Sequence, residues 1–258
     1  MKICSWNVNS IRARIDNIKY YLSHSSPDIV FFQEIKTEEK NFPFNDLKKL
    51  GYVSYVSGQK SYNGVSILSK TKLTQINKTL PGDKVKQARL ISANIKFKKK
   101  NIELINIYVP NGNPVDTEKY KYKKKWLNQM IIEINKKLKK NIHLIIGGDF
   151  NIIPEERDVY DHQKFVNDAL FKLEIRKKYR TLINLGLNDA YRYLNKDKQE
   201  FTFWEYMGGS WPKNHGMRID LFLVSNDLLN HVSKIYIDKK MRSRIKPSDH
   251  VPVEIELN

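Results

Sequence analysis

The sequence has few of the residues that stabilise small secreted proteins or membrane spans. It contains one cysteine, Cys4, which excludes a disulfide framework and a zinc site built from cysteines. No apolar run approaches the roughly 18 residues that a membrane-spanning helix needs, and no leader precedes the first strand-like segment. There is no linker, repeat or low-complexity segment. These absences predict a single domain over residues 1–258, a cytoplasmic location and no membrane partner.

Acidic side chains are also scarce. The chain has 28 Asp and Glu against 46 Lys and Arg, which gives a formal net charge of +18. A charge this far from zero favours polyanionic partners such as nucleic acid. A general compositional bias is the alternative, because lysine, isoleucine and asparagine are abundant throughout the chain. The charge therefore supports a nucleic-acid partner without establishing one.

The hydrophobic pattern mixes strands with helices. Apolar residues at helical spacing predict helices over 11–22, 118–140 and 162–185. Hairpins around Asn63-Gly64 and Lys98–Asn101 accompany a strand–helix–strand unit at the amino end, so parallel and antiparallel pairs should coexist. The sequence predicts an α/β fold with two packed mixed β-sheets and helices outside. The predicted strands are 2–9, 29–34, 52–57, 64–68, 90–97, 102–109, one within 143–151, 201–204, 217–224 and 248–255.

Polar side chains stand at or near the ends of six predicted strands. The run from His143 to Ile146 stops at two glycines, and Asp149 and Asn151 follow. The glycines are expected to let the chain turn and a large ligand approach closely. Ligands of α/β sheets gather at the carboxyl ends of strands, although Gly, Asp and Asn also favour ordinary turns. The other strands carry Asn7, Glu34, Tyr108, Asp220, Asp249 and His250 in this position.

Convergence of these ends would place four carboxylates, an imidazole, amides and a phenol in one site. So many carboxylates repel one another unless a cation lies among them, and oxygen-rich sites suit Mg²⁺, with Mn²⁺ as a substitute. A hard metal in a basic protein points to hydrolysis of phosphate esters, with amides and the phenol as donors to the phosphate oxygens. No Walker loop, Gly-x-Ser-x-Gly motif or Cys nucleophile is present, which favours direct hydrolysis over a covalent intermediate.

Seven short motifs resemble, in order, those of the exonuclease III family of apurinic/apyrimidinic endonucleases, within the endonuclease/exonuclease/phosphatase superfamily. The resemblance implies a four-layer α/β sandwich that works as a monomer. It also implies a Mg²⁺-dependent nuclease of base excision repair, which hydrolyses the phosphodiester 5′ of abasic sites in double-stranded DNA. Removal of blocked 3′ ends by 3′-5′ exonuclease or 3′-phosphatase activity is a further expectation. The motifs span residues 2–12, 33–36, 62–65, 108–111, 147–151, 218–220 and 248–250.

The same resemblance implies a role for each matching residue. Glu34 would bind the metal, with Asn7 and Asp249 close to it. Asp149 would orient or deprotonate the attacking water, with Asn151 beside it. Asp220 would hold His250. The remaining matches would contact DNA: His250, Tyr108 and Asn111 at the scissile phosphate, with Arg89 nearby, and Phe203, Trp204 and Met217 around a flipped-out abasic sugar. Flipping out such a sugar costs little stacking energy, because its base is missing.

Two positions depart from the family pattern. Met217 stands where an aromatic residue or Leu is expected, and Gln87 stands where an acid is frequent. Met217 puts the shape of the sugar pocket in doubt.

Several residues have structural alternatives. Tyr108 could be strand-end packing, Asn7 could cap the following helix, and Phe203 and Trp204 could belong to the core. Arg12, Lys36 and the lysines of 121–125 could contact DNA phosphates or be solvated.

Two rival functions remain. One is a superfamily phosphatase that acts on small phosphate esters, and the other is a DNA-binding relative that has lost catalysis. The basic charge disfavours the first, and the intact set of acids disfavours the second.

Overall fold

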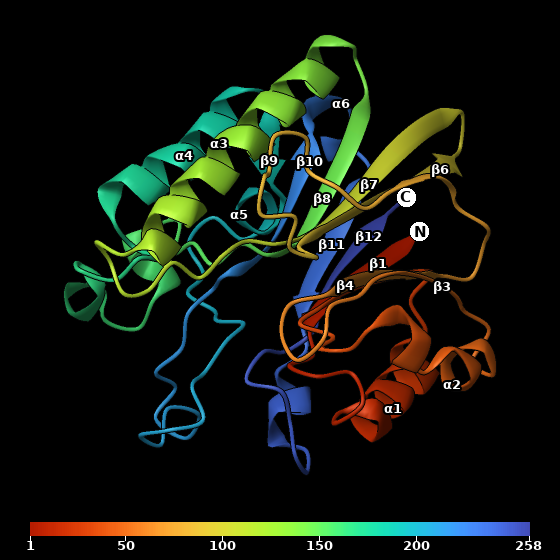
Figure 1. Cartoon of the computed structure of the whole chain (residues 1–258), viewed down its shortest axis with the longest axis horizontal. Helices are drawn as coiled ribbons and strands as arrows, with labels where there is room; N and C mark the ends of the chain where they lie inside the picture. The colour runs from red at the N-terminus through yellow and green to blue at the C-terminus, as the bar shows by residue number, and fades with distance from the viewer.

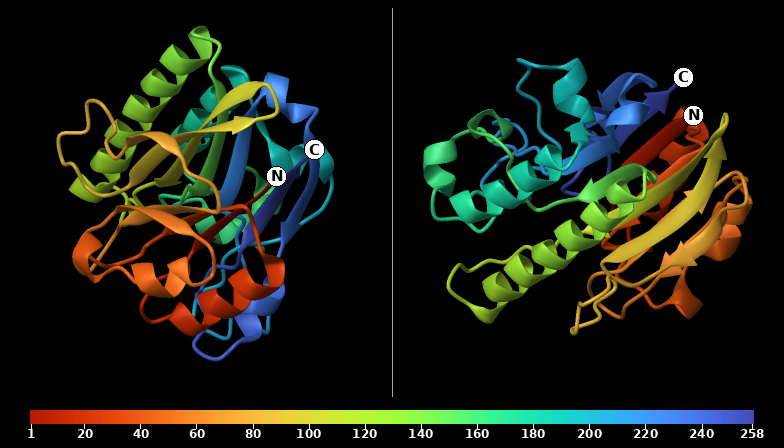
Figure 2. Two further views of the ribbon diagram at one scale, coloured as in Figure 1. Left: turned by 90° about the vertical axis from the view of Figure 1, so that its right-hand side faces the viewer. Right: turned by 90° about the horizontal axis from the view of Figure 1, so that it is seen from above.

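Two six-stranded sheets pack face to face, and helices cover their outer surfaces (Figures 1 and 2). The computed structural model describes all residues from 1 to 258. Both sheets contain parallel and antiparallel neighbours, as the sequence predicts. None of the helices combines the length and the apolar content needed to cross a membrane. The predicted four-layer α/β sandwich is confirmed.

The first sheet, here sheet A, contains both ends of the chain. Its strand order is β11-β12-β1-β2-β4-β3, and β1 pairs in parallel with β2 through helix α1. On the other side β1 pairs with β12 in antiparallel orientation, so the first and last strands are neighbours. The bounds are β1 Lys2–Asn7, β2 Ile29–Gln33, β3 Val53–Ser57, β4 Val65–Ser69, β11 Val232–Ile237 and β12 Val253–Leu257.

The second sheet, here sheet B, carries the central strand β8. The strand order is β5-β6-β7-β8-β10-β9, in which β8 runs parallel to β7 and antiparallel to β10. The bounds are β5 Thr74–Asn77, β6 Leu90–Phe97, β7 Lys100–Tyr108, β8 His143–Asp149, β9 Leu187–Asp189 and β10 Asp220–Ser225.

Three hydrophobic clusters fill the spaces between the four layers. One lies between the sheets, and the others lie beneath the helices on each outer face. Helices α1 and α2 cover sheet A, and α3 and α4 cover sheet B. The α-helices are α1 Ile15–Ser25, α2 Phe44–Lys48, α3 Glu118–Lys139, α4 Leu173–Asn184, α5 Ala190–Leu194 and α6 Asn226–Leu229; the 3₁₀ turns are η1 Glu39–Asn41, η2 Glu156–Asp158, η3 His162–Phe165 and η4 Lys239–Ser243.

Buried amides connect the two sheets through their apolar interface. Gln33 of sheet A donates from Nε2 to Asn106 Oδ1 of sheet B at 2.7 Å. The Asn106 amide nitrogen returns two hydrogen bonds of 2.9 Å, to the carbonyls of Phe32 and Ser66. Buried polar groups need partners of defined geometry, so these contacts favour one register of the two sheets.

The predicted helix over 162–185 is wrong in its first half. The chain forms only the short η3 turn and then, after an irregular stretch, α4. Asp168 explains the break, because its side chain accepts from the backbone N–H of Leu170 and from the Asn113 amide. An Asp that bonds its own backbone competes with a continuous helix.

Other boundaries also differ from the prediction. Residues 201–204 form isolated bridges at Phe203 instead of a strand, and β5, β9, β11 and α5 were not predicted. The second hairpin is tighter than expected, since Phe97 pairs with Lys100. Strand β10 begins at Asp220, so this carboxylate lies at the strand's start and not in its middle. Strand β12 begins at Val253, so Asp249 and His250 precede it.

The two glycines before Asp149 do not turn the chain or make room for a ligand. Both lie inside β8 and are buried. A Cβ on Gly147 would lie 2.6 Å from the Phe222 ring and 2.8 Å from that of Phe31. A Cβ on Gly148, whose φ is +145°, would lie 2.0 Å from the Ile107 carbonyl oxygen. The glycines therefore allow close packing between and within the sheets.

We expect Gly148→Ala to destabilise the fold by about 3 kcal/mol or more, because a strained backbone and a steric overlap add together. Gly51→Ala is the matched control: Gly51 also has a positive φ, +87°, but no atom lies within 4 Å of its added Cβ. The control should cost about 1–2 kcal/mol. Urea denaturation measures both losses, and equal losses would contradict the packing argument.

Candidate active site

The predicted polar residues meet at one end of the sandwich. Asn7, Tyr108 and Asp149 end strands β1, β7 and β8, and Glu34 directly follows β2. Strand β10 runs antiparallel to β8 and pairs Asp220 with Asp149, so its amino end lies at the same place. The antiparallel pairing of β12 with β1 brings the residues before β12 there as well.

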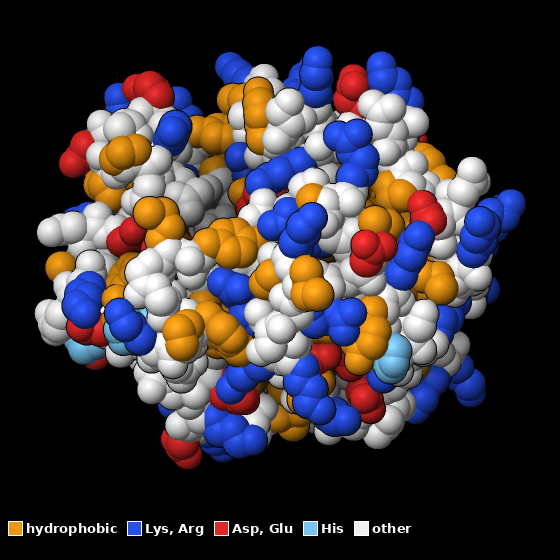
Figure 3. Space-filling view, turned by 90° about the horizontal axis from the view of Figure 1, so that it is seen from below, with side chains coloured by type: hydrophobic (Ala, Val, Ile, Leu, Met, Phe, Trp, Pro, Cys, Tyr) orange, Lys and Arg blue, Asp and Glu red, His pale blue; other side chains and the backbone are white.

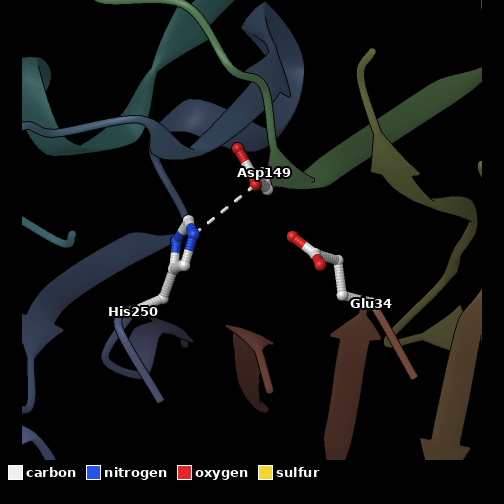
Figure 4. A group of neighbouring side chains, drawn as sticks. All are labelled: Glu34, Asp149 and His250. Atoms are coloured by element: carbon white, nitrogen blue, oxygen red, sulfur yellow. Dashed lines mark ion pairs between the residues drawn. The ribbon is translucent and has the colours of Figure 1, made fainter. Parts of the chain in front are cut away.

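Three side chains form the centre of this site. Glu34, Asp149 and His250 point toward one another (Figure 4), with their ligand atoms within 4.8 Å. They come from three elements that are distant in sequence, and both carboxylates lie near the imidazole. Two hard oxygen donors side by side are suited to a cation such as Mg²⁺.

Asn7 orders the two carboxylates. Its Nδ2 donates to Glu34 Oε1 at 2.9 Å and to Asp149 Oδ2 at 3.0 Å. In this orientation the amide nitrogen, and not the oxygen, faces the carboxylates. The oxygen accepts from the backbone N–H of Asn9. Because α1 begins only at Ile15, the helix-capping alternative for Asn7 is excluded.

Lys36 provides the counter-charge of Glu34. Its Nζ lies 2.8 Å from Glu34 Oε2 and 2.5 Å from Asn9 Oδ1. Burial disfavours the charged carboxylate, but Lys36 and Asn7 together hold the pKa of Glu34 below its usual value. Lys36 is therefore part of the site and not a solvated surface lysine. Asp249, a predicted metal neighbour, instead accepts from Asn9 Nδ2 at 3.1 Å and lies outside the central group of three.

Asp149 is a buried acid with a perturbed pKa. Burial raises the pKa of its carboxyl to about 7; nearby His250 opposes this rise, and Asp220 adds to it. Oδ1 accepts from the backbone N–H of Asn151 at 2.9 Å, which fixes the carboxylate. A carboxyl with a pKa near neutrality can exchange a proton with a substrate or water at physiological pH.

His250 carries a proton at neutral pH. Burial disfavours the imidazolium, but the carboxylates of Asp220, Asp149 and Asp249 outweigh it and raise the pKa of His250 to about 10. Nδ1 donates to Asp220 Oδ2 at 2.8 Å. Nε2 lies 3.7 Å from Asp149 Oδ2 (Figure 4). The site therefore directs an N–H donor toward Asp149.

Thr202 holds the carboxylate that orients His250. Its hydroxyl donates to Asp220 Oδ2 at 2.6 Å and accepts from the backbone N–H groups of Ile219 and Asp220, both at 3.1 Å. Arg218, which precedes Asp220 by two residues, is buried and forms ion pairs with Asp158 and Asp189. The start of β10 is thus fixed by polar contacts on both sides.

Tyr108 lies at the edge of the carboxylate group. Burial, with Glu34 and Asp149 nearby, raises the pKa of its phenol well above the usual value, so the hydroxyl stays protonated and can donate. Arg89 stacks on the ring, with 4.7 Å from the guanidinium carbon to the centroid. Arg89 also donates to Gln87 Oε1 at 2.6 Å, so the neutral residue at position 87 still holds this arginine.

Lys123 connects the loops that follow β7 and β8. Its Nζ donates to the carbonyl of Asn111 at 2.8 Å and to that of Asn151 at 2.6 Å. Between the same loops, Asn111 Nδ2 donates to Asn151 Oδ1 at 3.2 Å. Lys123 is 0% exposed, and burial lowers its pKa to about 7. Of the lysines at 121–125, this one is a structural tie and not a surface charge.

The expected sugar pocket is only partly as predicted. Phe203 is half-buried, with its ring centroid 4.8 Å from that of His250, and Met217 pairs with it across a bridge. Trp204 is fully buried and packs edge-on against Trp211. The prediction that Trp204 contacts DNA is therefore corrected: neighbours in an extended segment point to opposite sides, so Phe203 faces the site and Trp204 the core.

The site geometry agrees with the comparison to known proteins. The sequence matches the Endonuclease/Exonuclease/phosphatase family over residues 4–250. The chain belongs to this family. Exodeoxyribonuclease III of Haemophilus influenzae is 31% identical to it over 265 residues that cover 99% of each chain. The resemblance to exonuclease III stated above is thereby confirmed.

Solved structures of family members superpose over nearly the whole length. An AP endonuclease from Archaeoglobus fulgidus is 34% identical, with a TM-score of 0.94, and covers 100% of this chain and 99% of its own. The 3′ phosphatase NExo from Neisseria, bound to a product DNA hairpin, is 32% identical with a TM-score of 0.95 and the same coverage. The fold of an exonuclease III type nuclease is therefore shown for this chain.

Four residues of this family member's site were missed or left undecided in the sequence. Thr202 gave no local signal, because its partners are distant in the chain. Asn9 ends the strand predicted over 2–9, but its contacts with Lys36 and Asp249 could not be predicted. For Lys36 the sequence left two alternatives open, contact with DNA phosphates or a solvated side chain. Lys123 did leave a trace, since it falls on the buried stripe of α3 that also contains Tyr120, Leu127, Met130 and Ile134.

Lys123→Met should change how stability depends on pH. The pKa of Lys123 is about 7 in the folded protein and about 10.4 in an unfolded chain, so between these values the unfolded state binds more protons. Wild-type stability therefore gains up to about 1.4 kcal/mol per pH unit from this group as pH rises. The gain is complete above about pH 10.4, is lost progressively as the pH falls from there to about 7, and is absent below that.

The measurement is the urea unfolding free energy from pH 7 to 10, taken as the difference between wild type and Lys123→Met. Loss of the His250 proton acts in the opposite direction in both proteins and cancels in this difference. Lys125→Met, at an exposed position of the same helix, is the control and should run parallel to wild type. A parallel curve for Lys123→Met would disprove the burial effect.

Proposed function

We propose that this protein is a Mg²⁺-dependent nuclease of DNA repair, which hydrolyses the phosphodiester 5′ of an abasic site in duplex DNA and leaves a 3′-hydroxyl. The observation that carries the proposal is the meeting of Glu34, Asp149 and His250 within 4.8 Å, in a chain of net charge +18. Carboxylates for a hard cation beside a protonated imidazole fit a phosphodiester.

The side chains divide the chemistry among them. Glu34 would hold the metal, and the two carboxylates that Asn7 orders make a donor set suited to Mg²⁺ or Mn²⁺. When bound, such an ion polarises the phosphate and stabilises the leaving oxygen. Asn9 accepts from Lys36, the partner of Glu34, and donates to Asp249, so it connects Asp249 to this ion pair.

Asp149 and His250 form an acid and base pair. Their environments raise both pKa values, to about 7 for Asp149 and about 10 for His250, so Asp149 gives up its proton first and His250 keeps its own at neutral pH. Asp149 would align the attacking water and take its proton, with Asn151 holding the carboxylate. His250 keeps its proton at Nε2 and would donate to a phosphate oxygen, while Asp220 holds the ring.

Phosphate and sugar contacts come from the rim of the site. Tyr108 retains its phenol proton and would donate to a non-bridging oxygen, as would the exposed amide of Asn111. Arg89 would contact the backbone nearby. Phe203 and Met217 would line the pocket for the abasic sugar.

A second candidate activity is repair of blocked 3′ ends. The Neisseria relative is described as a 3′ phosphatase, and the Haemophilus relative as an exodeoxyribonuclease. Met217 in place of an aromatic residue could change the wall of the sugar pocket and with it the balance between activities. We propose that the whole chain acts as one catalytic domain and as a monomer, and the cytoplasmic location stays a prediction.

A single assay separates this proposal from its rivals. The substrate is duplex DNA with one tetrahydrofuran abasic analogue, incubated with Mg²⁺ or with EDTA. We expect incision immediately 5′ of the analogue only when Mg²⁺ is present. Binding without incision would favour a non-catalytic DNA-binding protein, and activity on small phosphate esters with indifference to DNA would favour a phosphatase.

Asp149→Asn should abolish turnover and spare binding. The amide cannot take a proton from water, so we expect kcat to fall by about a thousandfold or more, with affinity for abasic duplex DNA within about threefold of wild type. Asp197→Asn, at an exposed surface position, is the control and should behave as wild type. Loss of DNA binding in a folded Asp149→Asn protein would refute the assigned role.

A further inference from the structure

An isoleucine projects from the end of the molecule that carries the site. Ile245 is 86% exposed, the highest value among the large hydrophobic side chains. It lies in the segment after η4, which projects past the end of the sandwich where β1 and β8 finish (Figure 1). Single exposed apolar residues are common on proteins, so exposure alone assigns nothing to Ile245.

The backbone around Ile245 is held rigidly. Asn17 of α1 is 6% exposed and donates from Nδ2 to the carbonyl of Ile245 at 3.0 Å and to that of Lys246 at 3.2 Å. Arg244 donates to the same Asn17 side chain at 2.9 Å, and its guanidinium stacks on Tyr20 at 3.6 Å. One buried amide therefore fixes three successive residues, and the exposure of Ile245 is built into the fold.

The surroundings of Ile245 are basic. A groove of about 560 Å³ lies between the start of α1 and residues 243–246, and it is lined by Arg14, Arg244 and Lys246 with Asp16 as its one acid. Figure 3 shows Lys and Arg side chains interleaved with hydrophobic ones across this end of the molecule. A groove of this charge fits a phosphate backbone.

The segment also leads directly into the catalytic residues. Pro247 accepts from the Tyr206 hydroxyl at 2.9 Å, Ser248 donates to the Asn7 carbonyl at 2.7 Å, and His250 follows. Five residues span at most about 18 Å. Since phosphates of one strand are about 3.4 Å apart along the axis, Ile245 lies within about five base pairs of a phosphate bound at His250.

We propose that residues 243–246 form a duplex-DNA contact in which Ile245 packs against sugars and bases flanking the scissile phosphate and Lys246 binds a phosphate. The inference rests on the proposed function and adds a contact to it. Apolar side chains held rigidly beside basic ones are a means by which proteins grip and deform a duplex. Because the loop is already ordered, binding sacrifices little conformational freedom.

The test is the dissociation constant for abasic-analogue duplex DNA, measured by fluorescence anisotropy in EDTA over a range of salt. Ile245→Ser should weaken binding about three- to tenfold at every salt concentration, because an apolar contact releases no counterions. Lys246→Ala should instead reduce the slope of log Kd against log salt by about one. Ile132→Ser, at a 45% exposed position on α3, is the control and should change nothing.

Duplex length provides the second arm. When the duplex is shortened one base pair at a time on the side that Ile245 contacts, the difference between Ile245→Ser and wild type should disappear at a length of at most about five base pairs, whereas shortening the other side should leave the difference intact. The proposed contact would be refuted if Ile245→Ser bound long duplex DNA as tightly as wild type does. It would also be refuted if the weaker binding of Ile245→Ser persisted after either side of the duplex was shortened. Failure of the wild type to bind DNA at all would overturn the proposed function as well.

Discussion

The site depends on hydrogen bonds that cross between the two sheets. Asn7 of sheet A shares one amide nitrogen between Glu34 on its own sheet and Asp149 on the other. Deeper in the interface, Gln33 and Asn106 repeat the same connection. Apolar side chains alone tolerate small sliding of one sheet over the other, whereas a buried amide loses its partner when the sheets shift. The carboxylates can therefore be held together against their mutual repulsion.

Charge within the site is balanced locally. Lys36 lies beside Glu34, and His250 lies between Asp149 and Asp220. Each acid has a basic or amide partner, and Glu34 and Asp149 share the Asn7 amide; a cation bound beside these two carboxylates would further reduce their mutual repulsion. The same arrangement keeps a proton on His250 and brings the pKa of Asp149 near neutrality, so acid and base chemistry coexist within a few ångströms.

Much of the site could be predicted from the polar side chains at the ends of predicted strands. Asp149 and Glu34 follow continuous apolar runs, a local pattern that survives in any single sequence. Asp220 and His250 were also assigned to predicted strands, but they lie at or before the amino ends of β10 and β12, and antiparallel pairing brings those ends to the site. The contacts of Asn9 and Thr202 could not be predicted, since their partners lie elsewhere in the sequence and only the packed sheets bring them together.

The errors have a common physical cause. Two glycines in a sequence predict a turn, because the sequence does not show that the rings of Phe31 and Phe222 occupy the space their side chains would fill. Phe203 and Trp204 were predicted to contact the same ligand, but the alternation of side chains along an extended segment places them on opposite sides. Lys123 among five residues that include four lysines reads as a solvated face, although its helical spacing places it on the buried stripe. In each case, contacts in the folded structure are needed to decide between two interpretations of the local sequence.

The pairing of β1 with β12 also determines when the site can form during synthesis. Ser248 reaches the Asn7 carbonyl across 241 residues, and the imidazole that faces Asp149 belongs to the final nine residues of the chain. A nascent chain on the ribosome therefore contains Asn7 long before it contains His250, and a product truncated before residue 248 lacks both the Ser248 contact and the imidazole that faces Asp149.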